Sequence, residues 1–323
     1  MLVGITLLCF VLSHAVPADP VAANLGEQAA AHPETVAAFR QRWGLDRPLP
    51  LQYALYLGRL ARGDMGMSIS THQPVAVDLA QHLPATIELA MAAMVVSLFV
   101  GIPLGMLSAV RRDSAVDGLS RVASLVGVSV PVFWLGLVAL LVFYAWLGWA
   151  PSPGQLSPRL SHPPVLTGFV TLDAVLAGRG DLARDALAHL ALPALVLGSY
   201  SVGVLTRMMR GSMLDVLGED YVRTARAKGL PGSAVTLRHA ARNALLPVLT
   251  VVGLSFGGLL SGAVVTESVF AWPGLGSYAF RSATSLDFPA IMGVGIVVAT
   301  VYLTVNLLVD VAYAIADPRI RMG

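Results

Sequence analysis

The sequence contains one cysteine and one lysine, and only 12% of its 323 residues are charged. A soluble globular domain has about 25% charged residues, so this composition indicates a membrane protein. With Cys9 alone, no disulfide can form within the chain. Lys228 is flanked by Ala227 and Gly229, so the chain lacks the G-x-x-x-x-G-K-[ST] loop that binds nucleotide phosphates. The net charge is +2 and the basic residues are scattered, which argues against a nucleic-acid-binding surface.

Catalytic and cofactor-binding patterns are also missing. The seven histidines are dispersed and lack ligand spacing, so we expect no metal site and no cofactor. Residues 253–257 read G-L-S-F-G, which matches the G-x-S-x-G of serine hydrolases, but they lie inside an uncharged apolar run without a base. We therefore expect no catalytic residue. The glycine spacing is instead typical of close helix packing, and we interpret six glycines in this way: Gly101, Gly105, Gly253, Gly257, Gly258 and Gly262.

Long apolar runs occupy much of the chain. The last five runs are each about twenty residues or longer, enough to cross a hydrocarbon core of roughly 30 Å. Without water their backbone groups must pair within helices, and Pro131 predicts a kink or break in the third run. The sequence therefore predicts an all-α polytopic membrane protein with about six transmembrane helices. The six runs are 1–16, 89–110, 122–150, 186–206, 244–266 and 288–309.

None of the five long runs carries an acidic or basic residue near its centre. An ionisable group there costs about 2.5 to 3.5 kcal/mol on insertion scales and is presumed functional. Glu88, Glu267 and Asp310 lie at run ends, where we expect snorkelling or helix capping. This distribution disfavours a secondary transporter built on a charged relay.

The basic residues predict the orientation. If the polar segment between the fourth and fifth runs is cytoplasmic, the cytoplasmic parts hold twelve of the 21 cations and seven of the 19 acids. This excess agrees with the retention of Lys and Arg on the cytoplasmic side, and six spans then place both termini in the cytoplasm. The first run is short and has a second interpretation, a cleaved signal peptide ending near Ala15 and Ala18. We favour a span, because cleavage would leave an odd number of crossings.

The expected domain organisation follows from these spans. Residues 1–16 form a short first transmembrane helix, 17–84 an external (periplasmic) subdomain, 85–316 the transmembrane core, and 317–323 a cytoplasmic tail. Within the subdomain, 35–45 and 51–62 have the apolar spacing of helices, and 63–71 is typical of a loop. A second external segment, 151–185, is rich in Pro, Gly and Ser, and we expect it to be irregular.

The cytoplasmic loop 211–243 is the most informative segment. Residues 214–228 favour a helix with acids toward its start and cations at its end, which matches the helix dipole. Gly229, Pro231 and Gly232 then predict a break, and Ser233 is a suitable N-cap for a second helix that continues into the fifth span. Two short helices joined rigidly to spans on both sides form an elbow through which a partner could tilt those spans. The alternative is an ordinary solvated loop.

Motifs across nearly the whole chain resemble one family, the inner-membrane permease subunits of ATP-binding-cassette (ABC) importers for dipeptides and oligopeptides. The elbow segment YVRTARAKG at 221–229 is similar to the coupling loop of that family. The other matching motifs are PATIELA at 84–90, SVPVFW at 129–134, RGSMLDV at 210–216, His239, RNA at 242–244, Pro247, Thr266, Glu267, Phe270, WPGLG at 272–276, NLLVD at 306–310 and DPRIR at 317–321.

The resemblance implies that the elbow enters a cleft on an ATPase subunit, with ATP hydrolysis on that partner and not on this chain. By this resemblance, seven residues have the coupling role: Arg223, Thr224, Ala225, Arg226, Ala227, Lys228 and Gly229. The Glu-Ala-Ala signature of the wider importer family reads Arg223-Thr224-Ala225 here, so an ion pair would run from Arg223 or Arg226 to an acid on the ATPase.

The resemblance also implies a second permease, two ATPases and an external peptide-binding protein as partners in a bacterial inner membrane. It implies dipeptides or short oligopeptides as the cargo, with nickel or glutathione as the alternative, since permeases for these share the architecture. A stand-alone channel or secondary carrier is the alternative from a different class.

Overall fold

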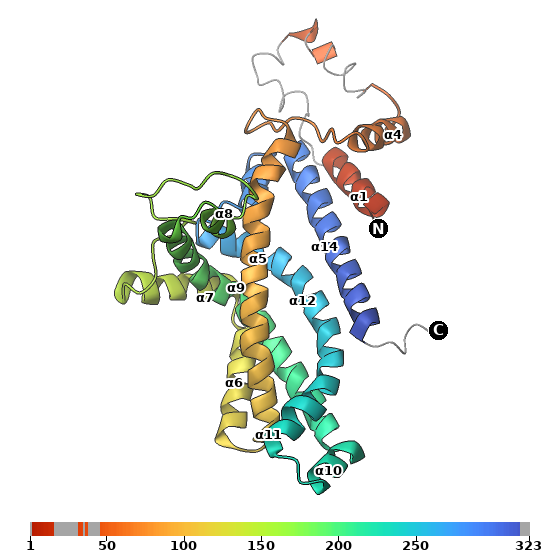
Figure 1. Cartoon of the computed structure of the whole chain (residues 1–323). Coiled ribbons are helices and arrows are strands. Elements are labelled where there is room, and N and C mark those ends of the chain that lie inside the picture. The colour runs from red at the N-terminus through yellow and green to blue at the C-terminus, as the bar shows by residue number, and fades with distance from the viewer. Residues whose placement is uncertain (1, 16–31, 35, 38–45, 317–323) are drawn as a thin grey trace. The chain divides into compact units, whose positions relative to one another are not determined.

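The computed structural model describes residues 2–15, 32–34, 36–37 and 46–316, which form helices, turns and one isolated bridge between Met67 and Pro74 (Figure 1). No strand is found in this part of the chain, so the predicted all-α class is confirmed. The chain divides into two compact units. Unit 1 comprises Met1–Pro84 and Gly274–Val301, and unit 2 comprises Ala85–Pro273 and Tyr302–Gly323.

Among its described residues, unit 1 contains three complete helices and the beginnings of two longer ones. These are α1 (Leu2–Ala15), α4 (Leu49–Leu60), α13 (Leu275–Thr284), the start of α5 (Val75–Val110) and the start of α14 (Phe288–Ala316). Apolar side chains of α5, α13 and α14 form one core, including Val75, Leu79, Leu275, Tyr278 and Ala290. The prediction of a helix at 51–62 is confirmed by α4, and that at 35–45 lies almost wholly outside the described residues.

The loop before α5 is held by buried carboxylates. Asp287 accepts hydrogen bonds from Ser68 Oγ at 2.6 Å and from Ser70 N and Oγ at 3.0 Å. Asp78 accepts one from the hydroxyl of Tyr278 at 2.9 Å. Burial, together with the neighbouring Asp78 carboxylate, raises the pKa of Tyr278 above its usual range. The loop predicted at 63–71 is confirmed, and its hydroxyl groups give it a fixed position within unit 1.

In unit 2, α9 (Gly180–Leu217) is the central helix. Its buried side chains form apolar cores with the remainder of α5 and with α12, and its residues also contact α6, α7 and α8. The other elements of unit 2, besides the end of α14, are α6 (Ala115–Ser129), α7 (Val132–Ala139), η1 (Leu140–Trp146), α8 (Val170–Leu176), α10 (Asp220–Ala227), α11 (Gly232–Ala234), η2 (Val235–Ala240) and α12 (Ala241–Val269).

Glycines allow α9 to pack closely against its neighbours. A Cβ atom added at Gly105 of α5 would lie 2.6 Å from the carbonyl oxygen of Thr206 and 2.7 Å from Cβ of Met209. Small residues permit such approaches between helices in a membrane. The packing prediction is confirmed at Gly101, Gly105, Gly253, Gly257 and Gly262. It is wrong at Gly258, where an added Cβ would meet nothing within 4 Å.

Four helices in the described part of the chain are long and apolar enough to cross a membrane: Val75–Val110, Gly180–Leu217, Gly232–Val269 and Phe288–Val309. A fifth crossing is available if α6 and the helix Val132–Trp146 are taken together, although they are bent by 105° at the residues around Pro131. The predicted break at Pro131 is confirmed, because the proline fixes its own φ and cannot donate to the helix ladder. The count of six stays a prediction, since α1 has only 14 residues.

Several local predictions are wrong. Residues 151–185 are irregular only in part, because α8 and the start of α9 lie within them. Glu267 does not snorkel, and Glu88 caps the start of α8, through Thr171 N, rather than the end of its own apolar run. Both are buried inside unit 2, where Glu88 accepts a hydrogen bond from Thr171 N at 2.9 Å and Glu267 accepts one from Thr86 Oγ1 at 2.5 Å. Long helices that begin outside the apolar runs explain the error: α5 starts well before Glu88.

Candidate functional site

The candidate site is the segment that joins α9 to α12 together with the first three residues of α12; it comprises residues 218–243, and we call it the connecting segment. It contains α10, a turn at Gly229, and α11 with η2, which lead directly into α12. Figure 1 shows α10 and α11 together at the end of unit 2 where α9 ends and α12 begins. The predicted pair of short helices is therefore confirmed in outline, with two differences in detail.

The first difference is a break at Gly218, which separates α9 from α10, whereas the sequence predicted one helix over 214–228. The second concerns the start of the next helix. Its N-cap is Pro231, with no side-chain hydrogen bond, so the assignment of Ser233 as N-cap is wrong. Proline fits this position because its φ is already near the helical value and the N–H that it lacks would have had no partner there.

One face of α10 packs against the rest of unit 2. Val222 is fully buried and Ala225 is 6% exposed, and both pack in a small apolar cluster with Val235 of η2. Val216 and Leu217 of α9 pack against the same cluster. Burying a valine side chain stabilises by roughly 1.5–3 kcal/mol. These contacts attach α10 to both flanking helices, so a displacement of α10 acts on α9 and on η2.

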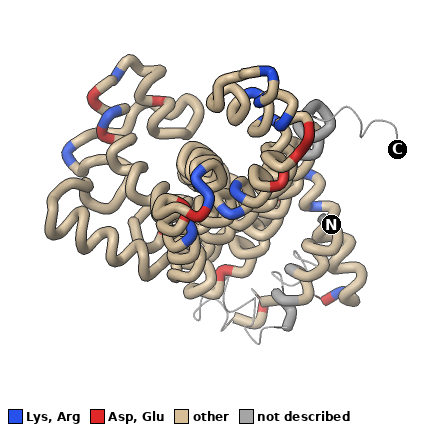
Figure 2. Tube along the Cα trace, turned by 90° about the horizontal axis from the view of Figure 1, so that it is seen from below, with Lys and Arg blue, Asp and Glu red and all other residues tan. Residues whose placement is uncertain are grey.

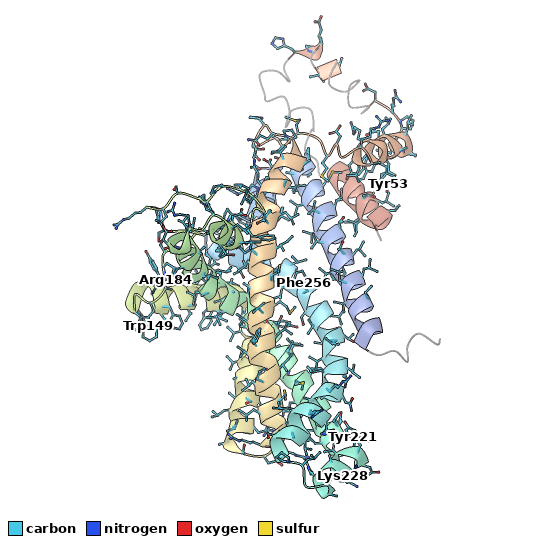
Figure 3. The ribbon with its side chains drawn as sticks, viewed as in Figure 1. Tyr53, Trp149, Arg184, Tyr221, Lys228 and Phe256 are labelled. Carbon is cyan, nitrogen blue, oxygen red and sulfur yellow. The ribbon has the colours of Figure 1, made fainter. Side chains whose placement is uncertain are left out.

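The opposite face of α10 is exposed. Of the seven residues given a coupling role by resemblance, Ala225 belongs to the buried face. The other six are exposed: Arg223, Thr224, Arg226, Ala227, Lys228 and Gly229. Figure 3 shows Lys228 and Tyr221 at this end of unit 2. Six of the seven residues therefore lie on one accessible surface, and the seventh, Ala225, packs beneath it.

Gly229 closes α10 with a turn that needs a left-handed residue. Its φ is +76°, its N–H donates to the Arg226 carbonyl at 2.9 Å, and Leu230 N donates to the Ala225 carbonyl at 3.4 Å. This pair of bonds is the Schellman arrangement that satisfies the last carbonyls of a helix. The prediction that Gly229 permits the turn is confirmed. An added Cβ would meet no atom within 4 Å, so conformation alone favours glycine here.

The connecting segment carries five cations and two acids. Arg223 forms an ion pair with Asp220 at 3.2 Å, but both side chains are largely exposed, and such pairs contribute little. It is the only ion pair on this segment among the residues described. Figure 2, viewed from the end where α10 and α11 lie, shows Lys and Arg positions on neighbouring turns there. The surface is electrostatically suited to an acidic partner.

Apolar side chains interrupt this basic surface. Tyr221 and Leu230 are each 39% exposed, and Leu237 is 64% exposed. The Tyr221 hydroxyl accepts a hydrogen bond from Asn243 Nδ2 at 2.7 Å, which links the start of α10 to the start of α12. The sequence analysis included Tyr221 and Asn243 in the matching motifs without giving them a role, and it missed Leu230 and Leu237, although apolar residues in a polar loop are a usable signal. Aromatic and apolar anchors within a charged rim are typical of a protein interface.

A buried ion pair lies beneath the same end of unit 2 and was also missed. The Asp117 side chain of α6 is fully buried and receives Arg210 Nε at 2.7 Å and Arg210 Nη2 at 2.9 Å. From sequence, Asp117 matches a capping box with Ser114, and Arg210 is one of many cytoplasmic cations. Nothing in a single sequence links two residues that lie 93 positions apart.

No catalytic constellation or metal site accompanies this surface. Among the described residues, no group of three or more His, Cys, Asp or Glu side chains could hold a metal ion. The arrangement can be gripped by a partner and can transmit force to α9 and α12. The long apolar helices and this exposed basic segment between two of them define a polytopic membrane protein.

Comparison with known proteins agrees with this class. The family model described as "Binding-protein-dependent transport system inner membrane component" matches residues 101–322, and a model for the N-terminal part of the same components matches residues 1–90. The chain belongs to this family of binding-protein-dependent transport system inner membrane components. It is thus a membrane permease component of an ABC importer that works with other subunits, and the resemblance stated from its motifs is confirmed.

Several curated relatives match over almost their full length. The probable D,D-dipeptide transport system permease protein of Escherichia coli is 47% identical over 99% of this chain and 94% of its own. The dipeptide transport system permease protein of Alkalihalophilus pseudofirmus is 42% identical over 99% of this chain and 96% of its own. The di/tripeptide transport system permease protein of Pseudomonas aeruginosa is 44% identical over 98% of this chain and 94% of its own.

Proposed function

We propose that this chain is a permease subunit of an ABC importer for dipeptides and other short peptides. The observation that carries the proposal is the agreement of full-length relatives at 42–47% identity, each named for a dipeptide or di/tripeptide system. Nickel and glutathione are not favoured, because none of these names refers to them. A buried charge relay of the kind that secondary carriers use is not needed, since the driving force would come from partner ATPases.

The connecting segment would be the contact with an ATPase. Its exposed cations, Arg223, Arg226 and Lys228, suit an acidic cleft, and Tyr221 and Leu230 supply apolar contact area. The cluster around Val222 would transmit a displacement of α10 to α9 and η2, because packed interfaces move as units rather than deform continuously. ATP binding and hydrolysis on the partner would thus alternate the access of the transport path.

The remaining partners follow from the same function. A second, homologous permease would complete the translocation path, two ATPases would bind at the cytoplasmic side, and an external binding protein would deliver the peptide. Residues 17–84 and 151–185 are proposed to form its external docking surface. With the connecting segment inside, both termini would be cytoplasmic, although the proposed tail 317–323 lies outside the described residues.

The test is reconstitution of the purified complex into liposomes that contain ATP. We expect a tagged chain to co-purify with two ATPases and a second permease, and to take up radiolabelled dialanine only with the binding protein and ATP. L,L- and D,D-dialanine, nickel and glutathione as competitors would define the cargo. Purification of the chain alone with ATP-independent uptake would favour a channel or carrier, and competition by nickel but not by dipeptides would overturn the peptide cargo.

A further inference from the structure

The Asp117 carboxylate lies at a junction of three helices. In addition to the two bonds from Arg210 of α9, it accepts one from Ser108 Oγ of α5 at 2.6 Å and one from Asp113 N in the α5–α6 turn at 3.0 Å. The exposed Arg121 adds a longer contact of 3.7 Å. Both carboxylate oxygens are therefore occupied, and one side chain of α6 connects α5, the turn and α9.

This junction lies close to the connecting segment along α9. Arg210 lies about two helical turns before the end of α9 at Leu217, after which the chain enters α10. Leu217 packs in the cluster that holds Val222 of α10. A force on α10 therefore reaches Arg210 through one short, continuous stretch of helix.

Above this junction, α9 packs against α5 through apolar side chains such as Leu205 and approaches both α5 and α6 closely at glycines. Gly105 lies against Thr206, and Gly203 lies against the carbonyl of Ser124. Between membrane helices the hydrophobic effect gives no net attraction, and apolar packing sets no fixed bond direction along or around a helix axis. A bidentate Arg–carboxylate pair has fixed directions, so it can oppose both motions. Its best-attested use in a buried position is to set register rather than to add stability.

We propose, on the basis of the function proposed above, that Asp117 and Arg210 are positioning residues that lock α5, α6 and α9 into one rigid body. With the lock closed, a displacement of α10 moves all three helices together. Without it, α9 moves against α5 and α6, and ATP is hydrolysed without an equivalent movement of peptide. The pair sets the stoichiometry of transport and touches neither peptide nor nucleotide.

The variants Asp117→Asn and Arg210→Lys test this assignment. The first removes the charge and one acceptor oxygen, and the second keeps the charge but loses the two-pronged geometry. Asp113→Asn is a matched control, because its side chain is exposed, its backbone N–H still donates to Asp117, and asparagine tolerates its φ of +60°. Arg207→Lys is the matched control on the exposed side of α9.

The double variant Asp117→Asn/Arg210→Gln separates positioning from stability. It leaves no unpaired buried charge, so the amount of assembled complex is expected to recover toward wild type. The quantity to measure is peptide imported per ATP hydrolysed in liposomes. We expect this ratio to fall by about two- to thirtyfold in Asp117→Asn and to stay low in the double variant. Both control variants are expected to keep the wild-type ratio.

A ratio of peptide imported per ATP at the wild-type level in Asp117→Asn, or one restored in the double variant, would overturn the proposal and leave the pair a purely stabilising role.

A second readout does not depend on cargo. Spin labels at Leu119 of α6 and Arg207 of α9, in a Cys9→Ser background, should show one distance with and without ATP in wild type and a broad or shifted distribution in Asp117→Asn. Identical distributions in both proteins would also contradict it. Failure of peptide uptake by wild type, with this distance result intact, would overturn the peptide function alone.

Discussion

At the scale of single residues, substitutions of Gly229 probe the backbone conformation of the turn and no side-chain packing within the chain. Because an added side chain meets open space, a substitution there costs only the strain of a left-handed residue, about 1–2 kcal/mol for an ordinary L-residue. We expect Gly229→Val to disturb the turn and reduce peptide uptake per complex, while Gly229→Asn, which tolerates this region, stays near wild type. Uptake normalised to complex in the membrane is the measurement. Equal loss in both variants would indicate that side-chain volume at the partner contact is what matters.

Gly105 and Gly258 form a contrasting pair of helix glycines. A Cβ at Gly105 would clash with the backbone of Thr206, so Gly105→Ala must separate α5 from α9 and should destabilise by about 1–3 kcal/mol. Gly258→Ala meets nothing and should be neutral or slightly stabilising, because alanine favours helix. Thermal unfolding of the chain in detergent would give both values. A stable Gly105→Ala protein would contradict the close packing described for α5 and α9.

Among the elements, α8 depends on a carboxylate at its start. Asp173 is 2% exposed and accepts hydrogen bonds from the backbone of Leu166, Thr167 and Gly168 and from the Thr167 hydroxyl. Burial raises the pKa of this carboxyl, but the hydrogen bonds lower it by more, so its pKa lies below the usual value.

The stabilisation from Asp173 is therefore complete above its unfolded pKa of 3.8 and is lost as the pH falls through the lower folded value. We expect Asp173→Asn to reduce stability by about 1–3 kcal/mol at pH 7, because its NH2 group cannot accept two of the four hydrogen bonds and its amide oxygen is a weaker acceptor for the other two. The difference in melting temperature between wild type and variant should stay constant from pH 7 to about 5 and shrink below that. A difference independent of pH down to 3 would contradict this role of the ionised carboxylate.

The elements also show what sequence reasoning could reach. Apolar run length and Pro131 predicted the long helices and the break, because both depend on local chemistry. The turn at Gly229 was predictable for the same reason. The ion pair of Asp117 with Arg210 and the burial of Glu267 were not, because they depend on tertiary contacts between residues far apart in sequence. Ala225 was grouped with exposed neighbours because its buried contact, Val235, lies beyond the turn.

At the scale of the whole molecule, charge on the connecting segment should govern assembly with the ATPase. We expect Arg223→Glu to lower ATPase binding and peptide uptake by up to about tenfold, since it places an acid where an acidic partner is proposed. Arg184→Glu, an exposed residue of α9 far along the chain, makes the same change in net charge and is the control. Co-purification in low and high salt is the measurement. Equal effects of both variants would point to net charge rather than to this contact.

The contacts between α5 and α9 bear on how many times the chain crosses the membrane between these two helices. Ala93 meets Gly198, Gly101 meets Val202 and Gly105 meets Thr206, so both numbers rise together and the two helices point the same way. If two helices cross a membrane in the same direction, the chain that joins them must cross it an odd number of times. The candidate for that crossing is α6 with the helix Val132–Trp146, which are bent by 105°, and residues 147–179 would then emerge opposite the α5–α6 turn.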